Sequence, residues 1–287
     1  MQPTRYLFTV TNGRSGQSAL YQIIKDNFPE VLPTFEHPKV NTKFKGVIGN
    51  LERKFRRNFI ETHELLGRGK VISSFRDGNY NFIYKIADKR INEINNLLKK
   101  SNKNIYFDIS KYFIRGLHIG FIKKLENFSL ILLVRDPITN MKSFINRKKF
   151  FYLDNDSPSS KSNILIMNET LLSKEELYFW SWCEYYLRYL KLINEKKIKS
   201  YSIIKTENIT NPEYLKIQLA KVDLVKPNIK INIKGSRNSN LEQGYEATTI
   251  TMEDIKIFEK FKNKIPKDLL NKIEYLKNYN PHEVHKF

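Results

Sequence analysis

The sequence of 287 residues predicts an α/β protein in which helices flank a central parallel sheet. Apolar runs at residues 6–10 and 128–134 are typical of strands that are buried on both faces. Segments with apolar residues at helical spacing alternate with such runs along the chain. This alternation favours parallel strands, and ligand groups then gather at the carboxyl ends of those strands.

The first half of the chain supplies most of the expected sheet. Leu20, Ile23, Ile24 and Phe28 fall on one helical face directly after the first strand. The further elements expected here are a proline-broken segment at 31–40, a basic helical region at 45–68, a short strand at 71–75, a helix at 81–100, a strand at 104–109 and an amphipathic helix at 113–125.

The second half is expected to complete the sheet and then become helical. The strand at 128–134 is followed by a helix to about residue 150, a loop at 153–172, an aromatic-rich helix at 173–197, a strand at 201–204, a helix at 211–222, a loop at 234–244 and two or three C-terminal helices. We expect one domain over residues 1–287, with a core at 1–222 and a loop with helices at 223–287.

Composition narrows the function classes. A net charge of +20 with a pI near 9.7 favours anionic ligands, although richness in Lys, Ile and Asn also fits a general compositional bias. Cys183 is the only cysteine, which excludes an intramolecular disulfide and a cysteine-based zinc cluster, and we expect it in the core. The first strand begins within six residues and the longest apolar run is short, so we expect a soluble, cytoplasmic chain.

Residues 11–18 join the first strand to the first helix with the sequence Thr-Asn-Gly-Arg-Ser-Gly-Gln-Ser. A strand, a glycine loop and a helix in this order direct free backbone N–H groups at one anion. Gly13 and Gly16 allow close backbone approach, and Arg14 adds a planar charge. The alternative is an ordinary turn with a capping serine. A Walker A loop is excluded because no Gly-Lys-Ser/Thr follows at the required distance.

A second candidate anion site follows the strand at 128–134. Arg135 stands at the strand end, and a helix that begins near residue 138 places Ser143 and Arg147 one turn apart on one face. Two guanidinium groups and a hydroxyl suit a phosphate monoester. Asp136 as N-cap and Pro137 in the first turn would explain a helix start, but not the spacing of the arginines and the serine.

Together these two segments resemble the sulfotransferases that use 3′-phosphoadenosine 5′-phosphosulfate (PAPS). Residues 13–18 resemble their 5′-phosphosulfate loop, and Arg135-Asp136-Pro137 with Ser143 resembles their 3′-phosphate motif. Arg147 extends the match toward tyrosylprotein sulfotransferases and bacterial relatives. The resemblance implies a P-loop-like sulfotransferase fold and transfer of a sulfuryl group from PAPS to a hydroxyl or amine, with 3′,5′-ADP as product and no metal.

The resemblance also implies roles for single residues. Glu36 would be the general base, with His37 beside it as the alternative, and Arg14 and Lys111 would stabilise charge on the leaving oxygen. The cofactor-binding residues implied are Gly13, Arg14, Ser15, Gly16, Gln17, Ser18, Arg135, Ser143, Arg147 and Arg237. Gln17 and Thr206 depart from the family pattern, which commonly has Thr and Tyr there.

Two other functions remain open. A P-loop-type nucleotide-dependent kinase is disfavoured by the missing Gly-Lys-Ser/Thr, and a non-enzymatic polyanion binder is suggested by charge alone. For the sulfotransferase, the expected partner is a small-molecule or saccharide acceptor, with no nucleic acid and no transmembrane segment. Basic residues Arg53, Arg56 and Arg57 could recruit an acidic acceptor or form a solvated helix face.

Overall fold

The computed structural model describes residues 3–38, 44, 46–59, 62–147, 161–225, 229–233 and 244–285. Its centre is a five-stranded, all-parallel sheet in the order β2-β3-β1-β4-β5, which confirms the predicted fold class. The strands are β1 (Arg5–Val10), β2 (Val31–Thr34), β3 (Ile105–Asp108), β4 (Phe128–Val134) and β5 (Ile198–Lys205).

Strand β2 was not predicted, and the strand predicted at residues 71–75 is wrong. Residues Lys70–Arg76 form helix α4, in which Val71, Ile72 and Phe75 are buried on one face. Val31–Thr34 pairs with β3 instead, although Pro33 interrupts it. Because β2 is an edge strand, the missing N–H of Pro33 is tolerated there.

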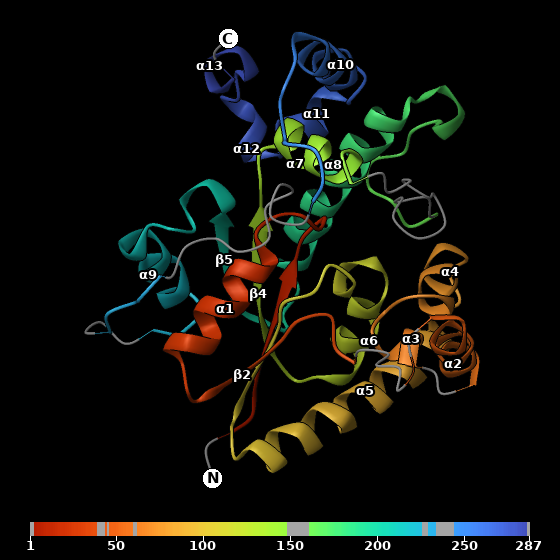
Figure 1. Ribbon diagram of the computed structural model, residues 1–287, viewed down its shortest axis with the longest axis vertical. Helices are drawn as coiled ribbons and strands as arrows, with labels where there is room; N and C mark the ends of the chain where they lie inside the picture. The colour runs from red at the N-terminus through yellow and green to blue at the C-terminus, as the bar shows by residue number, and fades with distance from the viewer. Residues whose placement is uncertain are drawn as a thin grey trace.

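Helices cover both faces of the sheet (Figure 1). Helices α1 (Gln17–Asn27) and α9 (Pro212–Ala220) share one apolar cluster with alternate residues of the strands, such as Leu7. Helices α5 (Tyr80–Ser101), α6 (Leu117–Lys124) and α8 (Lys174–Leu192) share the other with the intervening residues, such as Phe8. The two-residue period of the strands thus divides the core into two layers.

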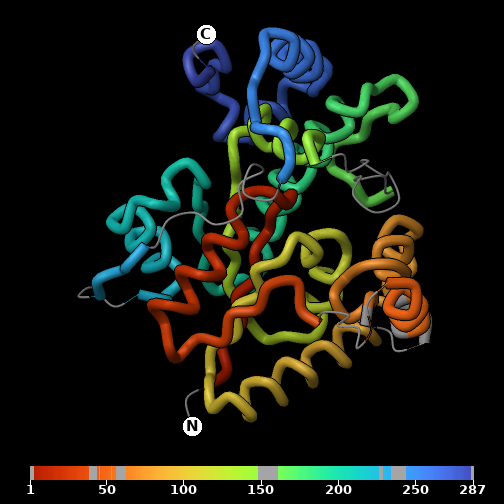
Figure 2. Tube along the Cα trace, in the orientation of Figure 1, coloured from red at the N-terminus to blue at the C-terminus, as the bar shows by residue number. Residues whose placement is uncertain are grey.

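The remaining helices are short or lie at the ends of the molecule. They are α2 (Gly46–Phe59), α3 (Thr62–Leu65), α7 (Pro137–Ile145), α10 (Met252–Lys262), α11 (Lys267–Leu270), α12 (Glu274–Lys277) and α13 (Pro281–Val284), with 3-10 turns η1 (Phe113–Arg115), η2 (Glu169–Leu171) and η3 (Thr206–Asn208). The C-terminal helices gather near α7 (Figure 1). The start of β1 lies at the opposite end of the molecule (Figure 2).

Helix α7 ends at Ile145, earlier than the expected end near residue 150. Its start matches the prediction, because Asp136 caps it and Pro137 opens it. Cys183 is buried as expected. In the described part of the chain, no helix is long and apolar enough to cross a membrane.

Candidate active site

The loop between β1 and α1 has the backbone geometry of an anion-binding turn. Gly13, Arg14 and Gly16 have φ values of 84°, 58° and 78°, so three of its residues lie in the left-handed region. Gly16 is the N-cap of α1, and no side chain caps the helix. The predicted alternative of a serine-capped turn is therefore wrong, and the first N–H groups of α1 remain available for an anion.

Neighbouring side chains crowd both glycines of this loop. A Cβ on Gly13 would lie 3.0 Å from Cδ of Lys111, and one on Gly16 would lie 3.0 Å from Cγ2 of Thr206. Either distance is shorter than an ordinary van der Waals contact. The loop therefore packs against Lys111 on one side and against η3 on the other.

Buried hydrogen bonds fix the shape of the loop. The Ser15 hydroxyl lies 3.1 Å from the Gly13 carbonyl oxygen and 3.3 Å from Oδ1 of Asn140, whose amide nitrogen donates to the Gly13 carbonyl over 2.9 Å. The Thr206 hydroxyl lies 2.9 Å from the Ser15 carbonyl oxygen and 3.0 Å from that of Val134. The Ser15 and Thr206 hydroxyls thus hold the loop against α7 and the end of β4.

The two predicted anion sites meet at Arg14. Arg135 donates from Nη1 to the Arg14 carbonyl oxygen over 3.1 Å, and Arg14 donates from Nε to the Ser143 hydroxyl over 3.4 Å. Segments 121 residues apart in the chain therefore form one surface. We call Arg14, Arg135, Ser143 and Arg147 the arginine cluster.

The arginine cluster concentrates positive charge in a partly buried environment. Burial, followed by the charges of Arg147 and Arg135, lowers the pKa of Arg14 to about 10. Burial also lowers the pKa of Arg135 and of Arg147, while Glu207 partly offsets the effect on Arg135. Repulsion between these guanidinium groups would be relieved by a bound anion.

A buried network behind the cluster holds Arg135 in place. Trp182 donates from Nε1 to the Arg135 carbonyl oxygen over 3.0 Å, and the Asp136 backbone N–H donates to Glu207 over 2.7 Å. Burial alone would raise the pKa of Asp136, but hydrogen bonds from His285, Tyr279 and Thr139 outweigh it and hold the pKa low. Sequence patterns gave no indication of the Asp136 contacts with Tyr279 and His285.

Strands β2 and β3 present acidic groups at the same edge of the sheet. Glu36 follows β2 with a φ of 48°, and its charge helps to raise the pKa of Asp108 at the end of β3. Burial is the larger cause, Arg90 opposes it, and the resulting pKa of Asp108 is about 7. Asp108 is 5% exposed, and its Oδ1 has no hydrogen-bond partner among the described residues. Asp108 was not among the predicted site residues, although an aspartate at the end of a parallel strand is a signal for such a site.

His37 and Lys111 differ in their surroundings. Buried Arg90 donates to the His37 carbonyl oxygen over 2.8 Å and approaches its Nδ1 at 3.3 Å, so the ring of His37 faces Arg90. Lys111 lies beside Gly13, with its Nζ 5.2 Å from the centroid of the Tyr112 ring. Lys111 therefore joins the loop, whereas His37 belongs to the Arg90 network.

Other predicted site residues have no described contact with the cluster. Gln17 is buried at the start of α1, and its side-chain nitrogen has no partner in the described part of the chain. Ser18 lies in the first turn of α1 and is half-buried. Arg237 lies outside the described residues, as do the side chains of Arg53, Arg56 and Arg57.

No protein-family profile matches the sequence, and no curated protein matches it. A solved sulfotransferase domain from the curacin biosynthetic pathway aligns with 92% of this chain and 99% of its own, at 12% identity and a TM-score of 0.42. These values are too low to assign a function, so the arginine cluster has to carry the functional inference.

Proposed function

We propose that the protein is a sulfotransferase that moves a sulfuryl group from PAPS to a hydroxyl or amine acceptor. One observation carries the proposal: Arg14 contacts both Arg135 and Ser143, so the two PAPS-like segments form one anion-binding surface. If these segments faced different parts of the molecule, they could not bind the two ends of one nucleotide. An anion with two separated phosphate groups suits this surface.

The segments divide the nucleotide between them. The N–H groups at the start of α1, with Gly13 and Arg14, would hold the 5′-phosphosulfate. Arg135, Ser143 and Arg147 would hold the 3′-phosphate. Tyr279 of the C-terminal region bonds Asp136, so we include residues 223–287 in the same domain as the sheet.

Chemistry in such a site depends on position and charge. The acceptor oxygen forms a bond to sulfur while the bond from sulfur to the bridging phosphate oxygen breaks, and 3′,5′-ADP leaves. Arg14 and Lys111 would stabilise the negative charge on that oxygen. Glu36 would accept the acceptor's proton. We favour Glu36 over His37 as the base because the His37 ring faces a buried arginine.

Thermal unfolding in the presence of 3′,5′-ADP tests the proposal. A ligand at a hundred times its dissociation constant stabilises the folded state by about 2.7 kcal/mol, so a clear rise in melting temperature is expected. ATP with Mg²⁺ serves as the comparison. Stabilisation by ATP with Mg²⁺ but not by 3′,5′-ADP would favour a kinase and overturn the proposal, and turnover with labelled PAPS and hydroxyl acceptors would extend it.

A further inference from the structure

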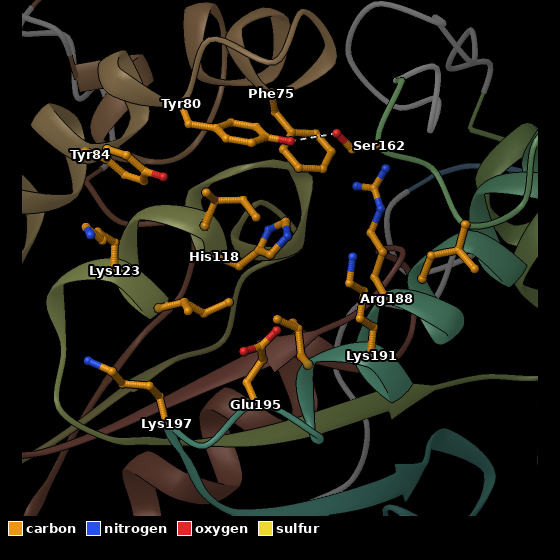
Figure 3. A pocket seen from close by; sticks show the side chains of 14 residues that line it. Phe75, Tyr80, Tyr84, His118, Lys123, Ser162, Arg188, Lys191, Glu195 and Lys197 are labelled. Carbon is orange, nitrogen blue, oxygen red and sulfur yellow. Dashed lines mark hydrogen bonds between the residues drawn. The ribbon is translucent and has the colours of Figure 1, made fainter.

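A cavity lies apart from the arginine cluster, between α4, α5 and α6 and the C-terminal end of α8 (Figure 3). Its volume is about 620 Å³, and none of its lining residues belongs to the arginine cluster or to the loop after β1. Cavities of roughly 300–1,000 Å³ are the usual size for small-molecule sites. The proposed sulfotransferase reaction makes no use of it.

One side of the cavity is aromatic and aliphatic. Phe75, Tyr80 and Tyr84 line this side (Figure 3). Ile119 and Ile122 of α6 also line the cavity. The Tyr80 hydroxyl is 2.6 Å from the hydroxyl of Ser162, so this ring is held in place. This wall would bury the apolar body of a ligand, and removing apolar surface from water favours binding.

The charged residues of the lining carry more positive than negative charge. Lys123, Lys191, Lys197 and Arg188 line the cavity with Glu195 as the single carboxylate. The Arg188 charge is matched by buried Glu184 at 2.7 Å, and Lys197 donates to the Leu125 carbonyl oxygen over 2.8 Å. For Lys123 and Lys191, by contrast, the described part of the chain offers no hydrogen bond or ion pair.

His118 adds a polar group to the wall without adding charge. Burial and then Arg188 lower the pKa of His118 to about 3, so its ring is neutral at physiological pH. The ring is 4% exposed, and its Nδ1 has no hydrogen-bond partner among the described residues. An unpaired buried nitrogen is costly, and a hydroxyl or N–H group of a ligand could pair with it once the atoms that cover it move aside.

We propose that this cavity binds a small amphipathic anion, with an apolar ring-containing body against Phe75, Tyr80 and Ile122 and an acidic group beside Lys191. The acidic group can be a sulfonate, sulfate, phosphate or carboxylate, because a lysine ammonium binds each as a point charge. The inference does not depend on the proposed transferase activity.

The fluorescent probe 8-anilinonaphthalene-1-sulfonate tests the site, because it joins an aromatic body, an N–H group and one sulfonate. We expect one probe per folded chain, and saturating 3′,5′-ADP should not displace it. Lys191→Glu should weaken probe binding about fivefold or more, since it reverses a charge beside the sulfonate. Lys256→Glu, an exposed lysine of α10 outside the cavity, is the matched control and should leave binding unchanged.

A second measurement does not depend on any variant. With isoleucine methyl groups labelled for NMR, the probe should shift the signals of Ile119, Ile122 and Ile164, which line the cavity, and spare Ile24, which lies on the buried face of α1. Equal weakening by both lysine variants, shifts outside the cavity, or displacement of the probe by 3′,5′-ADP would each overturn the inference. Displacement would place the probe in the nucleotide site and leave the proposed function intact.

Discussion

The carboxyl edge of the sheet has a basic side and an acidic side. Beside the ends of β1 and β4, burial and then the charges of Arg147 and Arg135 lower the pKa of Arg14 to about 10. At the ends of β2 and β3, burial and Glu36 raise the pKa of Asp108 to about 7. The basic side therefore favours binding of an anion, and the acidic side favours protonation of a carboxylate. Such a pair suits a reaction in which a phosphate-bearing donor meets an acceptor that must lose a proton.

The largest effect is expected from Glu36→Gln on the acidic side. A glutamine cannot take the acceptor's proton, so kcat should fall by about 10²–10⁴. The melting-temperature rise with 3′,5′-ADP should remain, because the arginine cluster is untouched. His37→Gln is the companion variant in the same steady-state assay. A larger loss of kcat in His37→Gln than in Glu36→Gln would assign the base to His37 instead.

Asp108 should make stability depend on pH. Its carboxyl holds a proton more tightly in the folded chain, with a pKa of about 7 against 3.8. The stabilisation is therefore fully present below about pH 4 and is lost as the pH rises through about 7, by at most about 4 kcal/mol. Urea unfolding across this range should show a decline in wild type that Asp108→Asn lacks. If the free energy of unfolding depended on pH in the same way in both proteins, the pKa of Asp108 would not be raised in the folded chain, and the prediction would be wrong.

On the basic side, Arg135→Gln should weaken 3′,5′-ADP binding about a hundredfold, as expected when a charged hydrogen-bond donor of about 3 kcal/mol is removed. Calorimetric titration measures the change. Arg76→Gln is the control, because Arg76 pairs with exposed Asp77 away from the cluster. Unchanged affinity in Arg135→Gln would show that the segment after β4 does not bind the nucleotide. The far-ultraviolet circular dichroism spectrum of Arg135→Gln should match that of wild type, which shows that the variant is folded.

The smallest effect concerns the loop backbone. Gly16→Ala should destabilise the fold by about 1–2 kcal/mol for its positive φ, plus the cost of moving Thr206. Gly78→Ala is the matched control for Gly16→Ala, because Gly78 has a similar φ of 74° but a Cβ there would meet nothing within 4 Å. The difference between their free energies of unfolding isolates the contact of the loop with η3. No difference would mean that Thr206 moves aside freely.

The sequence by itself determined the α/β class, most elements and the two segments that now meet. The strand at 128–134 and the Asp136 cap followed from local rules, because an apolar run and a capping aspartate act within a few residues. The strand at 31–34 was not predicted because Pro33 is tolerated only in an edge strand, and the sequence does not show which strands lie at the edge. The strand at 71–75 was wrong because a short apolar run can form a helix or a strand, depending on what packs against it.

Only the tertiary structure decided which side chains share an environment. It joined Arg14 to Arg135 and Ser143, turned the ring of His37 toward Arg90, and buried Asp108 beside Glu36. It also placed lysines of α6 and α8 around one cavity. These are long-range effects of burial and charge, and a pKa depends on what surrounds a group in space rather than on its neighbours in the chain.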